Sequence, residues 1–157
     1  MTKKIRTTTH SILIAFILLA VTVSTVFAAP PMDVHIEVTE YINTSGETFN
    51  ASGSAVDAGV VCPTGTVDDL VVDVSGPPGG IFRILNVLKR FNCEGSGDTF
   101  DVQLVVFLDL TTNETTARWN ITGGTGAYAG LHGNGSLVGT PIVPGNSILD
   151  VYDGNMH

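Results

Sequence analysis

From about residue 30 onward, the chain alternates between apolar and polar side chains with a period of two and shows no helical periodicity. Val34, Ile36 and Val38 begin this pattern, and residues 100–110 carry its clearest apolar stripe. Clusters of Gly, Pro, Asn and Ser interrupt the alternating runs, as turns between strands do. The pattern predicts an all-β domain.

The interruptions divide the domain into about eight strands with short connections. We expect them to begin near Val34 and to continue at residues 47–56, 66–75, 81–93, 100–110, 115–122, near Leu137 and at 148–153. Strands of this number and spacing either close into an antiparallel β-barrel or divide into a β-sandwich, and both arrangements protect the sheet edges. The alternation alone does not choose between them.

Residues 1–28 show the three-part pattern of a secretory signal peptide. Three basic residues precede an apolar run at residues 12–23, and Val26 and Ala28 stand where signal peptidase reads its substrate. The alternative is an uncleaved membrane anchor, because the weakly polar stretch nearly reaches the ~20 residues that span a bilayer. We favour cleavage, which leaves residues 29–157 as a single secreted, extracellular or cell-surface domain.

Removal of the signal peptide would take three of the seven basic residues and none of the fifteen acidic ones, leaving a formal net charge of -11. An acidic surface repels phosphate backbones and anionic lipids. We therefore expect no nucleic-acid partner, and no membrane partner once the signal has been cleaved.

Both cysteines, Cys62 and Cys93, lie in the exported part of the chain. An oxidising compartment favours a disulfide between them. A catalytic thiol would require a nearby histidine and an unpaired cysteine, and zinc would require four ligands at short spacing. Neither pattern is present, so we predict the disulfide, although the sequence does not show the distance between the two residues.

Five Asn-x-Ser/Thr triplets could accept N-linked glycans in a host with that machinery. They begin at Asn43, Asn50, Asn113, Asn120 and Asn134. A β-protein rich in Asn and Thr also generates such triplets by composition. A glycosylated Asn120 would have to face solvent, which predicts that Trp119 faces inward with its neighbours on the same side, Ala117 and Ile121.

The run from Trp119 to Ser136, with its Gly-Gly-Thr-Gly-Ala-Tyr core, resembles a signature of allene oxide cyclases and dirigent proteins. The segments 91–97 and 150–154 are also similar to secreted microbial relatives of unassigned function. The close similarity covers roughly eighteen residues, and over the rest of the chain it lies mainly in the pattern.

This resemblance implies an eight-stranded antiparallel barrel, often trimeric, with a cavity that opens at one end. It also implies a small hydrophobic ligand, whose cyclisation or coupling the barrel would guide by confinement and without a cofactor. We expect Phe100, Leu104, Trp119 and Tyr128 to line the interior as ligand contacts, with Tyr128 packed against Trp119. The glycines of the signature have a second, purely architectural interpretation, namely positive φ angles and close backbone contacts.

The residues themselves indicate no catalytic machinery. The mature chain offers only His35, His132 and His157 for acid-base chemistry, and no nucleophile elbow lies between a strand and a helix. The turn at 94–98 has oxygen ligands but lacks the order of a calcium loop, and a solvated hairpin is the better interpretation. We predict no metal site and no cofactor, and we assign no catalytic residue.

The sequence leaves the role of two strand faces undecided. Arg83 and Lys89 share one face of their strand; if it points inward, these cations could orient an anionic ligand, and if outward they offset surface acidity. Val105 and Phe107 make the outer face of the strand at 100–110 unusually apolar, which hints at a subunit contact.

Two functions follow for testing. The first is an exported barrel that binds a small hydrophobic molecule, with or without guiding its reaction. The alternative is a non-catalytic extracellular or cell-surface module that serves in structure or interaction. A cavity of more than about 300 Å³ would favour the first.

Overall fold

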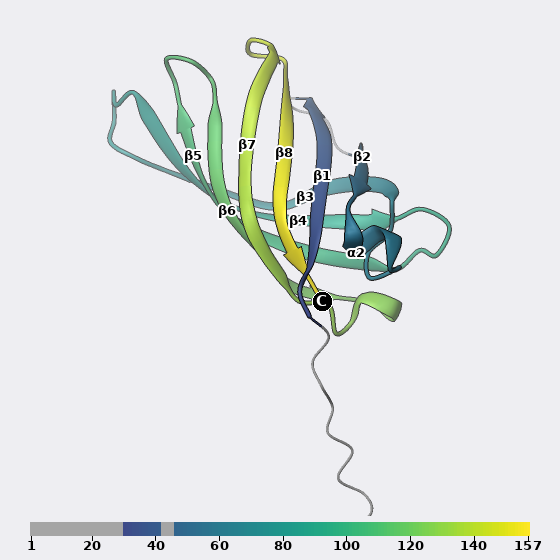
Figure 1. Cartoon of the computed structure of the whole chain (residues 1–157). Coiled ribbons are helices and arrows are strands. Elements are labelled where there is room, and N and C mark those ends of the chain that lie inside the picture. Colours follow the sequence, from purple (N-terminus) through teal and green to yellow (C-terminus); the bar gives the residue numbers. More distant parts are fainter. Residues whose placement is uncertain (1–29, 42–45) are drawn as a thin grey trace, which may run out of the picture.

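The protein is a closed eight-stranded antiparallel β-barrel in a computed structural model that describes residues 30–41 and 46–157. Each strand pairs with the next along the chain, and β8 (Ser147–Met156) closes the barrel by pairing with β1 (Met32–Tyr41) (Figure 1). The barrel, and not the sandwich, is therefore the correct fold. The predicted signal peptide at residues 1–28 and the triplet at Asn43 lie outside the described residues.

The other strands follow each other with short connections. They are β2 (Glu47–Ser52), β3 (Thr64–Ser75), β4 (Phe82–Cys93), β5 (Thr99–Asp109), β6 (Thr115–Gly124) and β7 (Gly133–Val143). A one-turn helix, α2 (Ser54–Asp57), lies between β2 and β3, and a 3₁₀ turn, η1 (Gly126–Tyr128), lies between β6 and β7.

On β1 and β6, the alternation in the sequence correctly identifies which side chains face inward. Val34, Ile36 and Val38 are all buried in the barrel. On β6, Trp119 is buried and Asn120 is exposed, so the orientation inferred from the glycosylation triplet is confirmed. Ala117 and Ile121 are buried on the same side.

Aromatic rings fill one half of the barrel, the half nearer the start of β1 and the end of β8. Phe91 and Phe100 stack with centroids 4.8 Å apart, and Phe49 meets Phe91 edge-on at 5.2 Å. Tyr152 packs edge-on against Phe91 at 5.8 Å. These side chains are almost completely buried, so this half of the interior is a packed core.

The prediction that the second strand continues to Val56 is wrong, because the one-turn helix α2 replaces its last residues. Strand β2 ends at Ser52, and Gly53 adopts a φ of 105°, which favours glycine. The Gly53 carbonyl then accepts hydrogen bonds from the N–H groups of Val56 and Asp57, which start α2. A single turn is too short to leave a helical period in the sequence.

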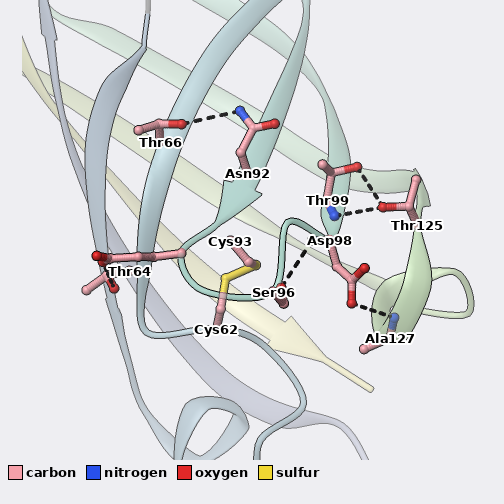
Figure 2. Close-up of a disulfide and its surroundings, with 11 residues drawn as sticks. Cys62, Thr64, Thr66, Asn92, Cys93, Ser96, Asp98, Thr99, Thr125 and Ala127 are labelled. Atoms are coloured by element: carbon pink, nitrogen blue, oxygen red, sulfur yellow. Dashed lines mark hydrogen bonds between the residues drawn. A yellow bond between two sulfur atoms is a disulfide. The ribbon is translucent and has the colours of Figure 1, made fainter.

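A disulfide joins Cys62, just after α2, to Cys93 at the end of β4, as predicted (Figure 2). The two Cα atoms are 5.8 Å apart, a normal separation for such a bond. In the turn that follows Cys93, the Asp98 carboxylate accepts a hydrogen bond from the Ala127 N–H at 3.1 Å. The same end of the barrel thus holds the disulfide, this turn and η1 (Figure 2).

The glycine-rich signature has an architectural role in the structure. Gly126 has a φ of 52°, and a side chain there would collide with the Asp98 carboxylate. A Cβ on Gly124 would collide with the Tyr128 carbonyl oxygen, whereas one on Gly123 would meet nothing within 4 Å. Only two of the three glycines are therefore required by sterics.

The expected contact between Tyr128 and Trp119 is wrong. Tyr128 packs edge-on against Phe100 with centroids 5.9 Å apart, while Trp119 lies against Tyr152 at 6.4 Å. The 3₁₀ turn carries Tyr128 to the β5 side of the barrel, and the β6 alternation directs Trp119 to the centre.

Candidate functional site

A cavity of about 420 Å³ occupies the other half of the barrel, where β1 ends and β8 begins. Its wall is mostly aliphatic, from Val72, Leu85, Val87, Leu104, Val106, Leu137 and Ile148. Four ionisable side chains, Glu40, Asp69, Lys89 and Asp150, interrupt that wall together with Tyr41 and Thr115. The barrel therefore has one packed end and one hollow end.

Lys89 settles which face of β4 points inward. It is only 6% exposed, and its Nζ donates to Glu40 Oε1 and to Asp69 Oδ1, both at 2.7 Å. Arg83 instead donates to the backbone carbonyls of Gly80 and Phe82 near the β3–β4 turn. The one cation that lines the cavity is thus already shared by two carboxylates.

The surroundings favour the charged form of Lys89 more than the charged form of Glu40. Burial alone would lower the pKa of Lys89, but Glu40 and Asp69 together outweigh burial and raise it. Burial raises the pKa of Glu40, and Lys89 offsets this only in part. The reason is that Glu40 shares its cation with Asp69 and also feels the nearby charge of Glu47.

Asp150 is the most perturbed acid of the site. It is 8% exposed, and the Thr115 hydroxyl is placed to donate to its carboxylate. Burial is the main cause that raises its pKa to about 7, and the charge of Glu40 adds to it. Lys89 acts in the opposite direction, too weakly to restore the ordinary pKa of the carboxyl.

Thr115 and Asp150 converge over a glycine. Gly139 on β7 pairs with Thr115 on one side and with Asp150 on the other. A Cβ on Gly139 would collide with both Thr115 Oγ1 and Asp150 Oδ1. Both oxygens are buried, and the Thr115 side chain acts on the Asp150 carboxylate as a hydrogen-bond partner that opposes the rise of its pKa. The two side chains form a small buried polar pair at the cavity wall.

Of the four predicted ligand contacts, the structure places only Leu104 on the cavity wall. Phe100 and Tyr128 belong to the aromatic packing of the closed half. Trp119 is 2% exposed, and its indole N–H donates to the Ser136 carbonyl at 3.0 Å. Their role as ligand contacts stays a prediction.

The sequence analysis considered Lys89 as an inward-facing cation but missed the acidic residues of the cavity, although a signal for one of them was present. Ile148, Asp150 and Tyr152 alternate on β8, so an acid occupies an inward position between two large apolar side chains. Such a residue is costly to bury and points to a function or to a partner. The charged neighbours of Asp150 could not be predicted, because they come from distant parts of the chain. Glu40 and Lys89, which bond to each other, are 49 positions apart in sequence.

The four predicted glycosylation sites within the described residues and the three histidines lie outside the cavity. Asn50, Asn113, Asn120 and Asn134 are all exposed, which is the geometry that modification requires. His35 is half-exposed, and a hydrogen bond to Asp153 at 2.7 Å raises its pKa. The rings of His132 and His157 lie 5.9 Å apart at the packed end.

The described ranges, 30–41 and 46–157, contain no group of three or more His, Cys, Asp or Glu side chains placed to hold a metal ion. Their helices include none with the length and apolar character needed to cross a membrane.

A second apolar feature lies on the outer surface. Val105, Phe107 and Val138 are each about half-exposed and line a shallow groove across β5, β6 and β7. Phe82 extends this surface by stacking on Phe107 with centroids 5.1 Å apart. The apolar face expected from Val105 and Phe107 is therefore exposed in the single chain.

The fold and the site define the class: a disulfide-bonded β-barrel with one packed end and one hollow end. Comparison with known proteins adds no relative, because no family model, no curated protein and no solved structure matches the chain.

Proposed function

We propose that this protein is an exported binding protein that holds a small hydrophobic molecule in the hollow end of its barrel. The observation that carries the proposal is the cavity of about 420 Å³, whose wall is mainly aliphatic. Cavities of roughly 300–1,000 Å³ with apolar walls and a few polar groups are typical of small-molecule sites. The interior is thus large enough for a ligand of one or two rings.

Export is part of this proposal. The disulfide between Cys62 and Cys93 is consistent with an oxidising compartment, and the signal-peptide pattern at residues 1–28 supports the same location. An extracellular barrel has no ready supply of cytosolic cofactors. If the protein guides the cyclisation or coupling of its ligand, as the resemblance to allene oxide cyclases and dirigent proteins implies, it would do so by confinement.

Binding of the fluorescent probe N-phenyl-1-naphthylamine tests the proposal. We expect the oxidised full-length protein to bind it with enhanced, blue-shifted emission. Leu104→Trp should fill part of the cavity and weaken binding at least tenfold, since Leu104 lies on its wall. Val105→Trp is the matched control, because Val105 is the next residue on β5 and faces outward.

A second variant keeps the test interpretable if Leu104→Trp does not fold. Val72 also lines the cavity but is 45% exposed, so Val72→Trp should narrow the site with little effect on folding. Equal probe binding by wild type, Leu104→Trp and Val72→Trp would contradict the proposal.

The outer groove supports a second candidate, a non-catalytic extracellular interaction module that forms a homo-oligomer. Its supporting observation is the exposed apolar surface at Val105, Phe107 and Val138. This candidate predicts self-association that survives when the cavity is filled by Leu104→Trp.

A further inference from the structure

We propose that the hollow end of the barrel docks on a zwitterionic lipid surface, into which two apolar hairpin turns insert. This inference goes beyond the proposed function, because docking requires no ligand in the cavity. Three observations carry it: the exposed apolar side chains gather at one end, two turns there lack ionisable groups, and one turn is continuous with the cavity wall.

The exposed large apolar side chains gather toward one end of the barrel. Among the described residues, each of them lies at the middle of its strand or nearer the hollow end, and the packed half exposes none. Single apolar side chains scattered over a surface are normal, whereas their concentration in one region marks an interaction site. The distribution therefore places such a site at the hollow end.

Two turns at this end carry no ionisable side chain. They are residues 74–82, between β3 and β4, and residues 141–148, between β7 and β8, and we call them the two apolar tips. Ile81 is 65% exposed and Ile142 is 52% exposed. Figure 1 shows the two turns at the same end of the barrel, apart from each other. A fluid lipid surface accepts separate apolar projections, whereas a folded partner would need a surface shaped to both.

The first apolar tip continues the aliphatic wall of the cavity. Val72 and Leu85 line the cavity. Val74 is exposed, follows Val72 on the same face of β3 and pairs with Leu85. An apolar strip thus leads from the interior to the tip, and the cavity would open toward the bound lipid. Entry of a hydrophobic ligand along this strip is a consequence that rests on the proposed function, but docking does not.

Charge decides which lipid suits this surface. The exported chain is strongly acidic, so anionic lipid repels it. The two apolar tips are themselves uncharged, and a zwitterionic surface therefore meets them without electrostatic repulsion. The sequence-based expectation of no membrane partner rests on that repulsion from anionic lipid, and the inference limits it to anionic surfaces.

Co-flotation with phosphatidylcholine vesicles tests the inference. The test uses oxidised residues 29–157, which contain every strand of the closed barrel, so the apolar run at 12–23 contributes nothing. We expect this protein to float with the vesicles, and Ile81→Asp combined with Ile142→Asp to lower its partition coefficient at least tenfold. Ala129→Asp is the matched control, because Ala129 is exposed at the packed end, and it should change the coefficient less than twofold. No flotation, or an equal loss in the double variant and the control, would overturn the inference.

Tryptophan substitution shows whether a tip enters the lipid. The natural Trp119 is buried in the barrel, so an indole at a tip gives a separate signal. Ile142→Trp should bind more tightly, since Trp favours the membrane interface, and phosphatidylcholine with brominated chains should quench its emission. Ala129→Trp should show neither effect. An unquenched indole in Ile142→Trp counts against insertion and overturns the inference.

Two further results separate docking from its alternatives. Phosphatidylglycerol added to the vesicles should weaken binding at low salt, and stronger binding would contradict a role for uncharged tips. If the double variant Ile81→Asp, Ile142→Asp converts an oligomer to a monomer while vesicles bind neither form, the tips are a contact between copies and the inference fails.

The proposed function is tested separately with the same proteins. Without vesicles, N-phenyl-1-naphthylamine should bind wild type and the double variant equally, because neither Ile81 nor Ile142 lines the cavity. Loss of vesicle binding with intact probe binding refutes docking alone. Vesicle binding without probe binding refutes the proposed function and supports docking.

Discussion

At the scale of single residues, the charges of the hollow end dominate the behaviour of the molecule. Lys89 is shared between Glu40 and Asp69, and Asp150 is left with a pKa of about 7. A carboxyl whose pKa is higher in the folded state binds more protons there than in the unfolded chain over the interval between the two values. Its contribution to stability is complete at low pH and is lost as the pH rises.

Asp150→Asn should therefore flatten the dependence of stability on pH. The pKa of Asp150 rises from 3.8 to about 7, so wild type loses stability between those values. At ~1.4 kcal/mol per pKa unit, the total is on the order of 4 kcal/mol. Denaturant unfolding at pH 5 and pH 8 should show that the free energy of unfolding falls less for the variant than for wild type between the two pH values.

Asp33→Asn is the control for that measurement, because it removes an exposed carboxylate from the neighbouring strand β1. It should keep the wild-type fall in stability above pH 5. If wild type and Asp150→Asn lose the same stability between pH 5 and pH 8, the buried carboxyl is not the cause.

At the scale of elements, close packing between β6, β7 and β8 depends on two glycines beneath Trp119. Gly135 and Gly154 are opposite each other, and a Cβ on either would come within 2.7 Å of the indole ring or closer. The ring can therefore lie directly on the backbone of two strands. The positions tolerate no side chain without displacing Trp119.

Gly135→Ala should destabilise the protein by about 1–3 kcal/mol because it overpacks the core under the indole. Thermal unfolding and the near-ultraviolet signal of Trp119 would both report the change. Gly123→Ala is the matched control, because a Cβ there meets nothing within 4 Å, and it should change stability by less than about 0.5 kcal/mol. Equal effects of the two substitutions would contradict this account of the packing.

The disulfide connects elements that are distant along the chain. It ties the segment after α2 to the end of β4, across a sequence separation of 31. On the chain-entropy model, closing a loop of this size stabilises by about 3–4 kcal/mol. Replacing both Cys62 and Cys93 by Ala should lower the free energy of unfolding by about that amount in urea. A loss below about 1 kcal/mol would show that the bond does not constrain the unfolded chain.

The strands and their facing could be predicted because alternation is a local property of the sequence. Asn120 and Trp119 illustrate this, since one exposed side chain fixes its neighbour on the opposite face. The one-turn helix α2 could not be predicted, because four residues carry no period. Barrel closure depends on the pairing of β1 with β8, and the alternation is the same in a sandwich.

The cavity could not be predicted from the sequence, for a different reason. Which inward-facing residues leave a space depends on how eight strands are placed in register. Phe100 and Leu104 share one face of β5, yet Phe100 stacks in the packed half and Leu104 borders the cavity. Asp150 could have been noted as an inward-facing acid, but its distance from Lys89 could not.

At the scale of the whole molecule, the barrel has an apolar cavity inside and an apolar groove on its outer surface. We propose the groove at Val105, Phe107 and Val138 as the contact of a homo-oligomer, for which the resemblance implies a trimer. Phe107→Lys should convert such an oligomer to a monomer, as measured by light scattering after size exclusion.

Val74→Lys is the control, because Val74 is 62% exposed and lies outside that groove. It should leave the mass unchanged. A monomeric wild-type protein would contradict the assignment of this groove to self-association, without affecting the cavity.

The central claim is that the ligand lies inside the barrel, and amide chemical-shift mapping by NMR tests it most directly. Addition of 3-phenylpropan-1-ol, a small apolar alcohol, to the labelled protein should shift the amides of Leu104, Val106, Leu137 and Asp150, which belong to residues on the cavity wall. Amides of the outward-facing residues Val105 and Val138 should move much less, because their side chains point to the outer groove. Shifts centred on the outer groove, or no shifts at a millimolar probe concentration, would contradict the claim.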